Sequence, residues 1–163
     1  MLRFRRAIES DVPVLRELAE RIWREYYPAI IGQAQVDYML PLMYSAEVIR
    51  GELANGTVWE IASDEDSTIG FCSISLEPDG RAKLHKLYLD TQRHGRGFGQ
   101  LLIRRAVEIA QELGAIALWL QVNKQNTRAI RAYERAGFRI DKAAVFDIGG
   151  GFVMDDFIMA KAL

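Results

Sequence analysis

A glycine-rich segment, His94-Gly95-Arg96-Gly97-Phe98-Gly99, lies between a strand-like run and an amphipathic helical pattern. The start of a helix exposes backbone N–H groups without partners inside the helix, and it carries the positive end of the helix dipole. Glycines let a ligand approach the backbone without meeting a Cβ atom. The chemistry that this segment favours is therefore the binding of an anion such as phosphate.

Two common phosphate-binding loops do not fit this segment. A dinucleotide-binding fingerprint would need glycine at positions 95, 97 and 100, but the last of these is Gln100. A P-loop needs Gly-Lys followed by Ser or Thr, which is absent. The segment resembles a third kind of phosphate-binding loop, the pyrophosphate loop of the GNAT acetyltransferases, whose pattern is Gln or Arg, two residues, Gly, one residue, and Gly or Ala. A tight turn between a strand and a helix, without a ligand, is the structural alternative.

The remaining pattern fits when Gly97 and Gly99 are its two glycines, which puts His94 in the place of the Gln or Arg. A second alignment, from Gln92 through Gly95 and Gly97, satisfies the letters but fits the helix start less well. Main-chain N–H groups provide most of the grip on a phosphate, so the glycines matter more than the first side chain.

A second pattern runs from Asn126 through Ala129 and Tyr133 to Gly137-Phe138. Seven residues of a helix are close to two turns, so Asn126 and Tyr133 project from nearly the same face. Ala129 lies between them and is small enough to admit a ligand. The alternative is a surface helix whose Tyr133 is simply part of the core.

The elements that must position these motifs follow from hydrophobic periodicity and turn residues. The predicted order is β-α-α-α-β-β-β-α-β-α-β-β, an α/β fold with a mixed sheet and helices on both faces. Ser10 is expected to cap the first helix, with Pro13 in its first turn. The nearly unbroken apolar run 115–122 predicts a strand buried on both faces. The predicted strands are 2–7, 57–62, 68–76, 81–89, 115–122, 138–147 and 152–161. The first predicted helix follows Ser10, with apolar residues at helical spacing from Val14 to Trp23, and the other predicted helices are 35–43, 45–53, 98–113 and 127–136.

The two motifs, in this order and on these elements, resemble the GNAT acetyltransferase superfamily over nearly the whole chain. The resemblance implies one N-acetyltransferase domain, residues 1–163, whose mostly antiparallel sheet splays between its fourth and fifth strands. It also implies acetyl-CoA as cosubstrate and no metal. The pantetheine arm would lie in the gap and bond to the main chain of Leu87 and Leu89, with the Leu87 N–H polarising the thioester carbonyl. The residues that the resemblance assigns to the cofactor are Leu87, Tyr88, Leu89, His94, Gly95, Arg96, Gly97, Phe98, Gly99, Gln100, Asn126 and Tyr133.

The same resemblance suggests the acid and leaves the base open. Tyr133 would protonate the departing CoA thiolate. Many members carry a Glu base on the fourth strand, but one common position holds Lys83, which cannot act as that base. His85 shares a strand face with Leu87 and Leu89 and titrates near ~6.5, so it is the candidate base or water-orienting group. A histidine that merely packs in the sheet is the alternative.

Two short segments, Leu84–Leu89 and Asp155–Met159, resemble the PaiA-type spermidine/spermine acetyltransferases. This favours a primary amine such as a polyamine as acceptor, which Glu25, Asp155 and Asp156 would attract. Asp155 and Asp156 could equally begin a solvent-exposed strand. A protein N-terminus or lysine is the second acceptor class, and a CoA-binding regulatory module without turnover is the third function.

The composition of the chain argues against several classes of partner and site. Lys+Arg of 21 against Asp+Glu of 22, a net charge of −1, gives no support for nucleic-acid binding. No stretch approaches ~18 uninterrupted apolar residues, so no membrane partner is expected. The single cysteine, Cys72, excludes an internal disulfide and offers no zinc-site spacing. We expect a cytoplasmic protein, and a homodimer stays open.

Overall fold

The computed structural model describes residues 1–163, which group into two compact units. The first unit comprises Met1–Ser73 and Lys86–Leu102, and the second comprises Ile74–His85 and Ile103–Leu163. Strands β3 (Ser67–Leu76) and β4 (Ala82–Leu89) and helix α5 (Phe98–Glu112) each contribute residues to both.

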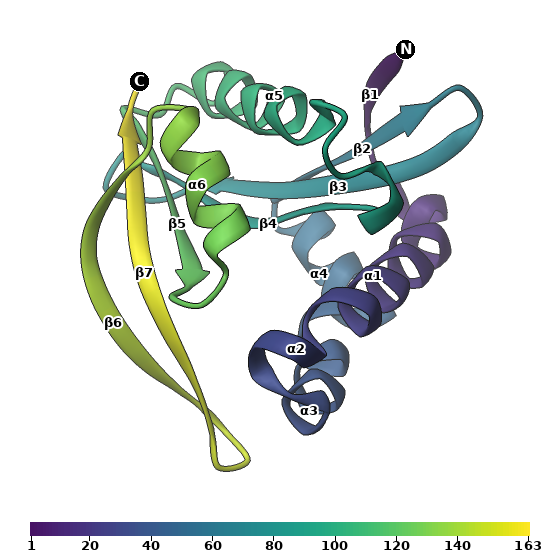
Figure 1. Cartoon of the computed structure of the whole chain (residues 1–163). Helices are drawn as coiled ribbons and strands as arrows, with labels where there is room; N and C mark the ends of the chain where they lie inside the picture. The colour runs from purple at the N-terminus through teal and green to yellow at the C-terminus, as the bar shows by residue number, and fades with distance from the viewer. The chain divides into compact units, whose positions relative to one another are not determined.

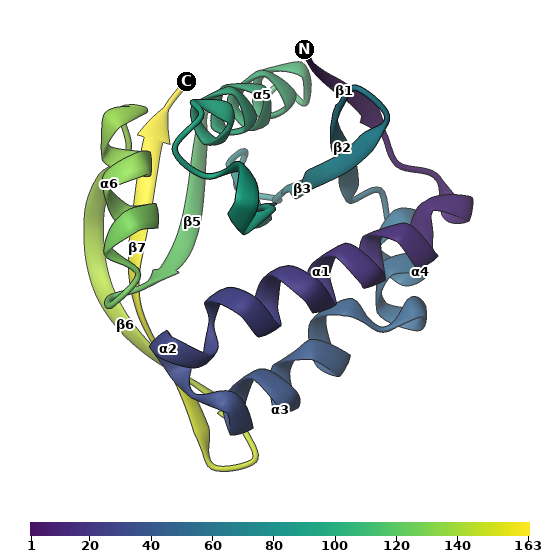
Figure 2. The ribbon, with the colours of Figure 1, turned by 45° about the vertical axis from the view of Figure 1, so that its right-hand side comes forward.

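The first unit contains strands and the four helices α1 to α4. Strands β1 and β2 are antiparallel, with Phe4 opposite Ala62, and helices α1 and α3 run side by side (Figures 1 and 2). Short 3-10 turns at 9–11 and 91–93 precede α1 and follow β4. The remaining elements are β1 (Leu2–Arg6), α1 (Val12–Tyr26), α2 (Pro28–Ile31), α3 (Gln33–Tyr44), α4 (Ala46–Ala54) and β2 (Val58–Asp64).

The second unit contains β5 (Ala117–Asn123), α6 (Thr127–Arg135), β6 (Arg139–Gly149) and β7 (Phe152–Ala162). Figure 1 shows β6 and β7 as a long, curved hairpin. Strand β5 pairs with β7 in antiparallel fashion and with β4 in parallel. The parallel ladder joins only Ala82–Leu84 to Leu118–Leu120, so it ends before His85. The strand order is β1-β2-β3-β4-β5-β7-β6.

The predicted mixed α/β architecture is confirmed, and the order of its elements is correct apart from one helix. The sequence prediction missed the four-residue helix α2, which begins at Pro28 and ends at Gly32, where φ is +82°. Four residues are too few to show helical periodicity, so only the Pro and Gly punctuation could have indicated it. None of the helices combines the length and apolar character that a bilayer crossing requires.

Two local predictions were wrong. Ser10 does not cap the first helix: it lies in the 3-10 turn, and Asp11 is the residue before α1. The Asp11 carboxylate accepts the Ile8 N–H at 2.8 Å and both terminal nitrogens of Arg5, which stabilises that turn.

Strand β5 is the second correction, because it is not buried on both faces. Leu118, Leu120 and Val122 are buried, and the residues between them are partly exposed. The partly exposed face carries Trp119 and Gln121, which bond to carboxylates of the same unit. Polar contacts, rather than a second apolar layer, therefore cover this face.

Candidate functional site

The predicted phosphate-binding segment lies in the first unit, between β4 and α5. Asp90 and the 3-10 turn Thr91–Arg93 follow β4, and α5 begins at Phe98. The Gly97 carbonyl accepts the Leu101 N–H at 3.4 Å, so helical bonding begins there. Helix geometry leaves the N–H groups of Phe98 and Gly99 without carbonyl partners inside α5, which is the arrangement that binds an anion.

Gly97 and Gly99 differ in why they are glycine. Gly97 has φ of +81°, a left-handed conformation that side chains disfavour. Gly99 is helical, and a Cβ built on it would meet nothing within 4 Å. A helical glycine costs about 1 kcal/mol relative to alanine. Neither backbone conformation nor packing within the chain accounts for Gly99, whereas close approach of a ligand would.

The backbone of β4 has a defined direction next to this segment. The Asp90 N–H donates to the Ile69 carbonyl of β3 at 2.7 Å. Successive N–H groups of a strand alternate in direction, so those of Leu87 and Leu89 point away from β3. The Leu89 carbonyl, on that same side, contacts His94 Nε2 at 3.1 Å. The edge predicted to bind the pantetheine arm is therefore turned away from the neighbouring strand.

The end of helix α1 holds the segment that follows β4. Arg21 bonds to Asp90 at 3.0 Å, and the Thr91 hydroxyl donates to Glu25 at 2.5 Å. The Tyr26 ring contacts His94 edge-on, with centroids 5.9 Å apart. Glu25, predicted to attract the acceptor, thus bonds to the turn after β4.

Tyr88, also assigned to the cofactor, has its side chain in an aromatic cluster of the first unit. The centroid of its ring lies 5.6 Å from the centroid of the Trp23 ring and 5.7 Å from that of the Phe71 ring. Lys86 is buried in the same cluster, 5.0 Å from the Trp59 ring, and pairs with Glu52 at 3.2 Å. The side chains of Lys86 and Tyr88 thus serve packing in the first unit.

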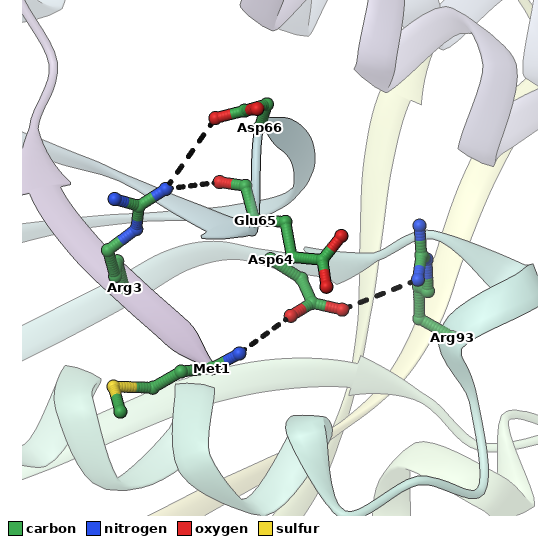
Figure 3. A network of polar contacts seen from close by, with 6 residues as sticks. All are labelled: Met1, Arg3, Asp64, Glu65, Asp66 and Arg93. Atoms are coloured by element: carbon green, nitrogen blue, oxygen red, sulfur yellow. Dashed lines mark hydrogen bonds and ion pairs between the residues drawn. The ribbon is translucent and has the colours of Figure 1, made fainter.

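A polar network around Asp64 reaches the turn after β4 (Figure 3). Asp64 accepts the terminal amine of Met1 at 3.1 Å and pairs with Arg93 at 3.4 Å. The bond to the amine, followed by the charges of Arg93 and Arg96, lowers the pKa of Asp64 against the effect of burial. Arg96 also lies over the Phe98 ring, 5.0 Å from its centroid. Arg93 and Arg96 thus place positive charge next to the glycine-rich segment, which favours an anion.

Asn126 and Tyr133 lie in the second unit, on α6. Asn126 is the N-cap, and its side chain accepts the Ala129 N–H at 3.4 Å. Tyr133 is buried, with its ring 5.5 Å from that of Phe138. Capping and packing therefore account for part of what the motif predicted, and the roles of both residues at a cofactor stay predictions.

His85 and Lys83 lie in the same unit, on β4. His85 Nε2 lies 2.6 Å from the Ser75 hydroxyl. The Lys83 ammonium lies 4.7 Å from the centroid of the Trp119 ring, and Trp119 Nε1 donates to Glu77. Burial lowers the pKa of Lys83, and the charges of Glu77 and Asp156 oppose that shift. At the two positions considered for a base, the imidazole of His85 is thus bonded to a hydroxyl, and Lys83 is a half-buried cation.

Asp155 and Asp156, treated together from the sequence, have opposite surroundings. Asp155 is exposed and pairs with Lys124 at 2.7 Å. Asp156 is only 3% exposed and accepts from Gln121 Nε2 at 3.5 Å. Burial raises the pKa of Asp156 to about 6. Gln121 was not among the predicted site residues, although a polar side chain inside an otherwise apolar strand was a signal for it.

Comparison with known proteins identifies the family. The family model described as the acetyltransferase (GNAT) family matches residues 15–138. Uncharacterised N-acetyltransferases of Mycobacterium tuberculosis and Mycobacterium bovis are 31% identical over 102 residues. That alignment covers 63% of this chain and 65% of each relative.

Two further relatives have named acceptors. The spermidine N(1)-acetyltransferase of Thermoplasma acidophilum is 27% identical over 157 residues, 93% of this chain and 91% of that protein. The peptidyl-lysine N-acetyltransferase YjaB of Salmonella typhimurium is 28% identical over 104 residues, 63% of this chain and 65% of that protein.

Among solved structures, the PaiA N-acetyltransferase of Thermoplasma acidophilum, in complex with coenzyme A, has the same fold. It superposes with a TM-score of 0.84 at 24% identity, over 100% of this chain and 99% of that chain. The chain belongs to the acetyltransferase (GNAT) family.

Proposed function

We propose that this protein transfers the acetyl group of acetyl-CoA to a primary amine, with residues 1–163 acting as one N-acetyltransferase domain. The observation that carries the proposal is Gly99, a helical glycine that nothing in the chain's own packing requires, next to exposed amides at a helix start. The family match supports it, since it spans residues of both units. Strands β3 and β4 also run from one unit into the other.

In this proposal the amides from His94 to Gln100 bind the pyrophosphate of the cofactor. Arg93 and Arg96 add positive charge, and the N–H groups of Leu87 and Leu89 bond to the pantetheine arm as a neighbouring strand would. The solved structure of the same fold is a complex with coenzyme A, which supports a cofactor of this type.

The chemistry is attack by a neutral amine on the thioester. An alkylamine with a pKa of ~10.4 is neutral in only ~1 in 2,500 molecules at pH 7, a penalty of ~4–5 kcal/mol. A group that accepts a proton is therefore useful. Tyr133 protonates the departing thiolate, and His85, held by Ser75, orients the amine or its water.

We favour a polyamine-like acceptor on the basis of the spermidine N(1)-acetyltransferase, because that similarity extends over nearly the full length of both chains. Charge complementarity adds little: Glu25 bonds to Thr91, and Asp155 pairs with Lys124. A peptide lysine is the second candidate, supported by the similarity to YjaB over 104 residues.

The test is thiol release from acetyl-CoA with a panel of amines: spermidine, spermine, a lysine peptide and a peptide with a free N-terminal alanine. We expect release with at least one amine and the highest kcat/KM with spermidine or spermine. A peptide preferred tenfold would reject the polyamine assignment alone. No release with any amine, from a protein that binds acetyl-CoA by calorimetry, would reject catalysis and favour a regulatory module.

Two matched variants separate cofactor binding from chemistry. Gly99→Glu puts a carboxylate against the pyrophosphate, so affinity for acetyl-CoA should fall at least tenfold, while folding persists because the position is helical and open. Tyr133→Phe should leave that affinity nearly unchanged and lower kcat, because the proton is needed only as the thiolate leaves. Calorimetry and steady-state kinetics measure the two effects.

A further inference from the structure

One face of the second unit gathers polar groups from three strands. Lys83 of β4 lies opposite Trp119 of β5, and Asn123 of β5 lies opposite Asp156 of β7. Opposite residues point to the same face, as do residues two apart on a strand. One face of the sheet therefore carries Lys83, His85, Gln121 and Asp156. His85 is the candidate base named from the sequence. Asp156 is the only carboxylate of this set.

Asp156 is placed where a carboxylate is costly. It is almost fully buried, and it accepts a hydrogen bond from a neutral amide, that of Gln121, at the long distance of 3.5 Å. The two nearby cations are engaged elsewhere, Lys83 over the Trp119 ring and Lys124 with Asp155. An ionised carboxylate with such weak compensation opposes folding.

The groups around Asp156 have opposing effects on its pKa, and the effect of burial is the largest. Burial is the largest effect and raises the pKa to about 6, and the charge of Asp155 adds to it. The bond from Gln121 and the charges of Lys124 and Lys83 act in the other direction. A carboxylate that titrates near neutral pH can both accept and release a proton under working conditions.

We propose that Asp156 is the proton acceptor of the acetyl transfer, replacing the glutamate that β4 lacks because Lys83 occupies its place. This inference rests on the proposed function. Lys83 cannot serve while it carries a proton, whereas Asp156 brings a carboxylate to the same face from β7. His85 then orients the amine or water, and the proton resides on Asp156.

The entering ammonium gives one proton to the Asp156 carboxylate and becomes a neutral amine. Its nitrogen attacks the thioester carbonyl, the C–N bond forms, and the C–S bond breaks. The thiolate leaves with the proton of Tyr133, and the second amine proton restores Tyr133 through solvent. Asp156 then releases its proton to solvent, so the products are amide, free thiol and one proton.

The experiment compares the pH profile of kcat/KM for the wild type, Asp156→Asn and Asp11→Asn, between pH 5 and 9, with the best acceptor of the amine panel. If Asp156 takes the ammonium's proton, the wild type rises to a break near pH 6 and then levels off. The Asp156→Asn protein can use only the amine that is already neutral in solution. Its kcat/KM should therefore rise about tenfold per pH unit through pH 9. At pH 7 its kcat/KM should be about 100-fold or more below the wild type.

Asp11→Asn is the matched control, a buried aspartate of the first unit outside the proposed machinery. It should keep the break near pH 6. An Asp156→Asn protein within threefold of the wild type at pH 7, with the same break, would overturn the inference. So would a loss of activity by the same factor at every pH, which is the signature of a structural defect.

A second readout needs no activity. A 13C NMR titration of the Asp156 side-chain carboxyl, assigned by its loss in Asp156→Asn, should show a midpoint near pH 6. A midpoint below 4.5 would sink the inference even if the enzyme acetylates amines. If the midpoint is near 6 but no amine reacts, the proposed function fails, and the proton-acceptor role fails with it.

Discussion

Asp11 and Asp156 are both buried aspartates, but their hydrogen-bond partners differ, and so does the direction of their pKa shifts. Asp11 accepts two bonds from Arg5, at 2.7 and 2.8 Å, and one from the Ile8 N–H. The bonds to Arg5 lower its pKa, against the effect of burial. Asp156 has a single long bond to a neutral amide, and burial raises its pKa.

The difference separates two uses of a buried acid. Asp11 joins β1 to the start of α1, and ionisation strengthens its bonds. The one bond that Asp156 accepts, from Gln121, could be accepted equally well by a neutral side chain. Ionisation of Asp156 lowers the free energy of unfolding. Groups kept at a cost to stability are concentrated at functional sites. The same residue type thus serves folding in the first unit and, as we infer, proton transfer in the second.

The largest expected effect is a difference in sign between two matched variants. At pH 7.5, Asp11→Asn should lose about 1–3 kcal/mol of unfolding free energy, because the Arg5 bonds weaken. Asp156→Asn should gain on the order of 1–3 kcal/mol, because it removes an ionisation that burial opposes. Urea unfolding measures both. A loss of stability in Asp156→Asn would erase the distinction.

The pH dependence of that gain follows from the sign of the shift. Because the folded pKa of Asp156, about 6, exceeds the ordinary aspartate value of 3.8, the folded state holds more protons between these two pH values. Stability from this group is therefore full below about pH 4 and is lost as the pH rises through 6. The advantage of Asp156→Asn over the wild type should accordingly shrink toward pH 4, whereas Asp11→Asn should approach the wild type only as acid removes the Asp11 charge.

A smaller effect is expected at Gln121. Replacing it with leucine removes the bond that favours the charged form of Asp156, so the break in the kcat/KM profile should move upward. A hydrogen bond of about 1 kcal/mol corresponds to about 0.7 pH units. A break that stays in place, or moves down, would mean that the Gln121 bond does not reach the titrating group.

The smallest effect is expected at Lys83. Lys83→Met removes a nearby positive charge, which should raise the same break by a few tenths of a pH unit, since this charge is the weakest of the influences on Asp156. Because Asp156 is buried and Lys83 is half-buried, the difference between wild type and variant should persist at ~0.5 M salt. A tenfold or greater fall in kcat/KM at pH 8 would instead assign Lys83 a direct part in the reaction.

The sequence predicted the architecture well because its strands and long helices are periodic and clearly punctuated. The glycine segment and the Asn126–Phe138 motif were sufficient to predict the family. Local rules were less reliable: Ser10 is a good cap by type, but Asp11 was held by Arg5, a partner six residues away. No local rule predicts such a choice.

The candidate site was harder to predict because its chemistry depends on burial. Asp155 and Asp156 are identical in type and adjacent, yet only the second is buried, since strand residues alternate in direction. That alternation was predictable, but the buried side was not, because it depends on how β5 and β7 are covered. Gln121 was a visible polar residue within the run 115–122, but its role was missed because that run was interpreted as apolar on both faces.

The bonds from α1 to the turn after β4 have a consequence for engineering. Arg21 and Glu25 are one helical turn apart, and they fix Asp90 and Thr91 from the same side. A library that varies the end of α1 to change acceptor preference would also loosen the segment proposed to hold the cofactor. Screens that report only product at one acetyl-CoA concentration would discard variants whose new preference is real. Holding Arg21 and Glu25 constant, or screening at saturating acetyl-CoA, should recover them.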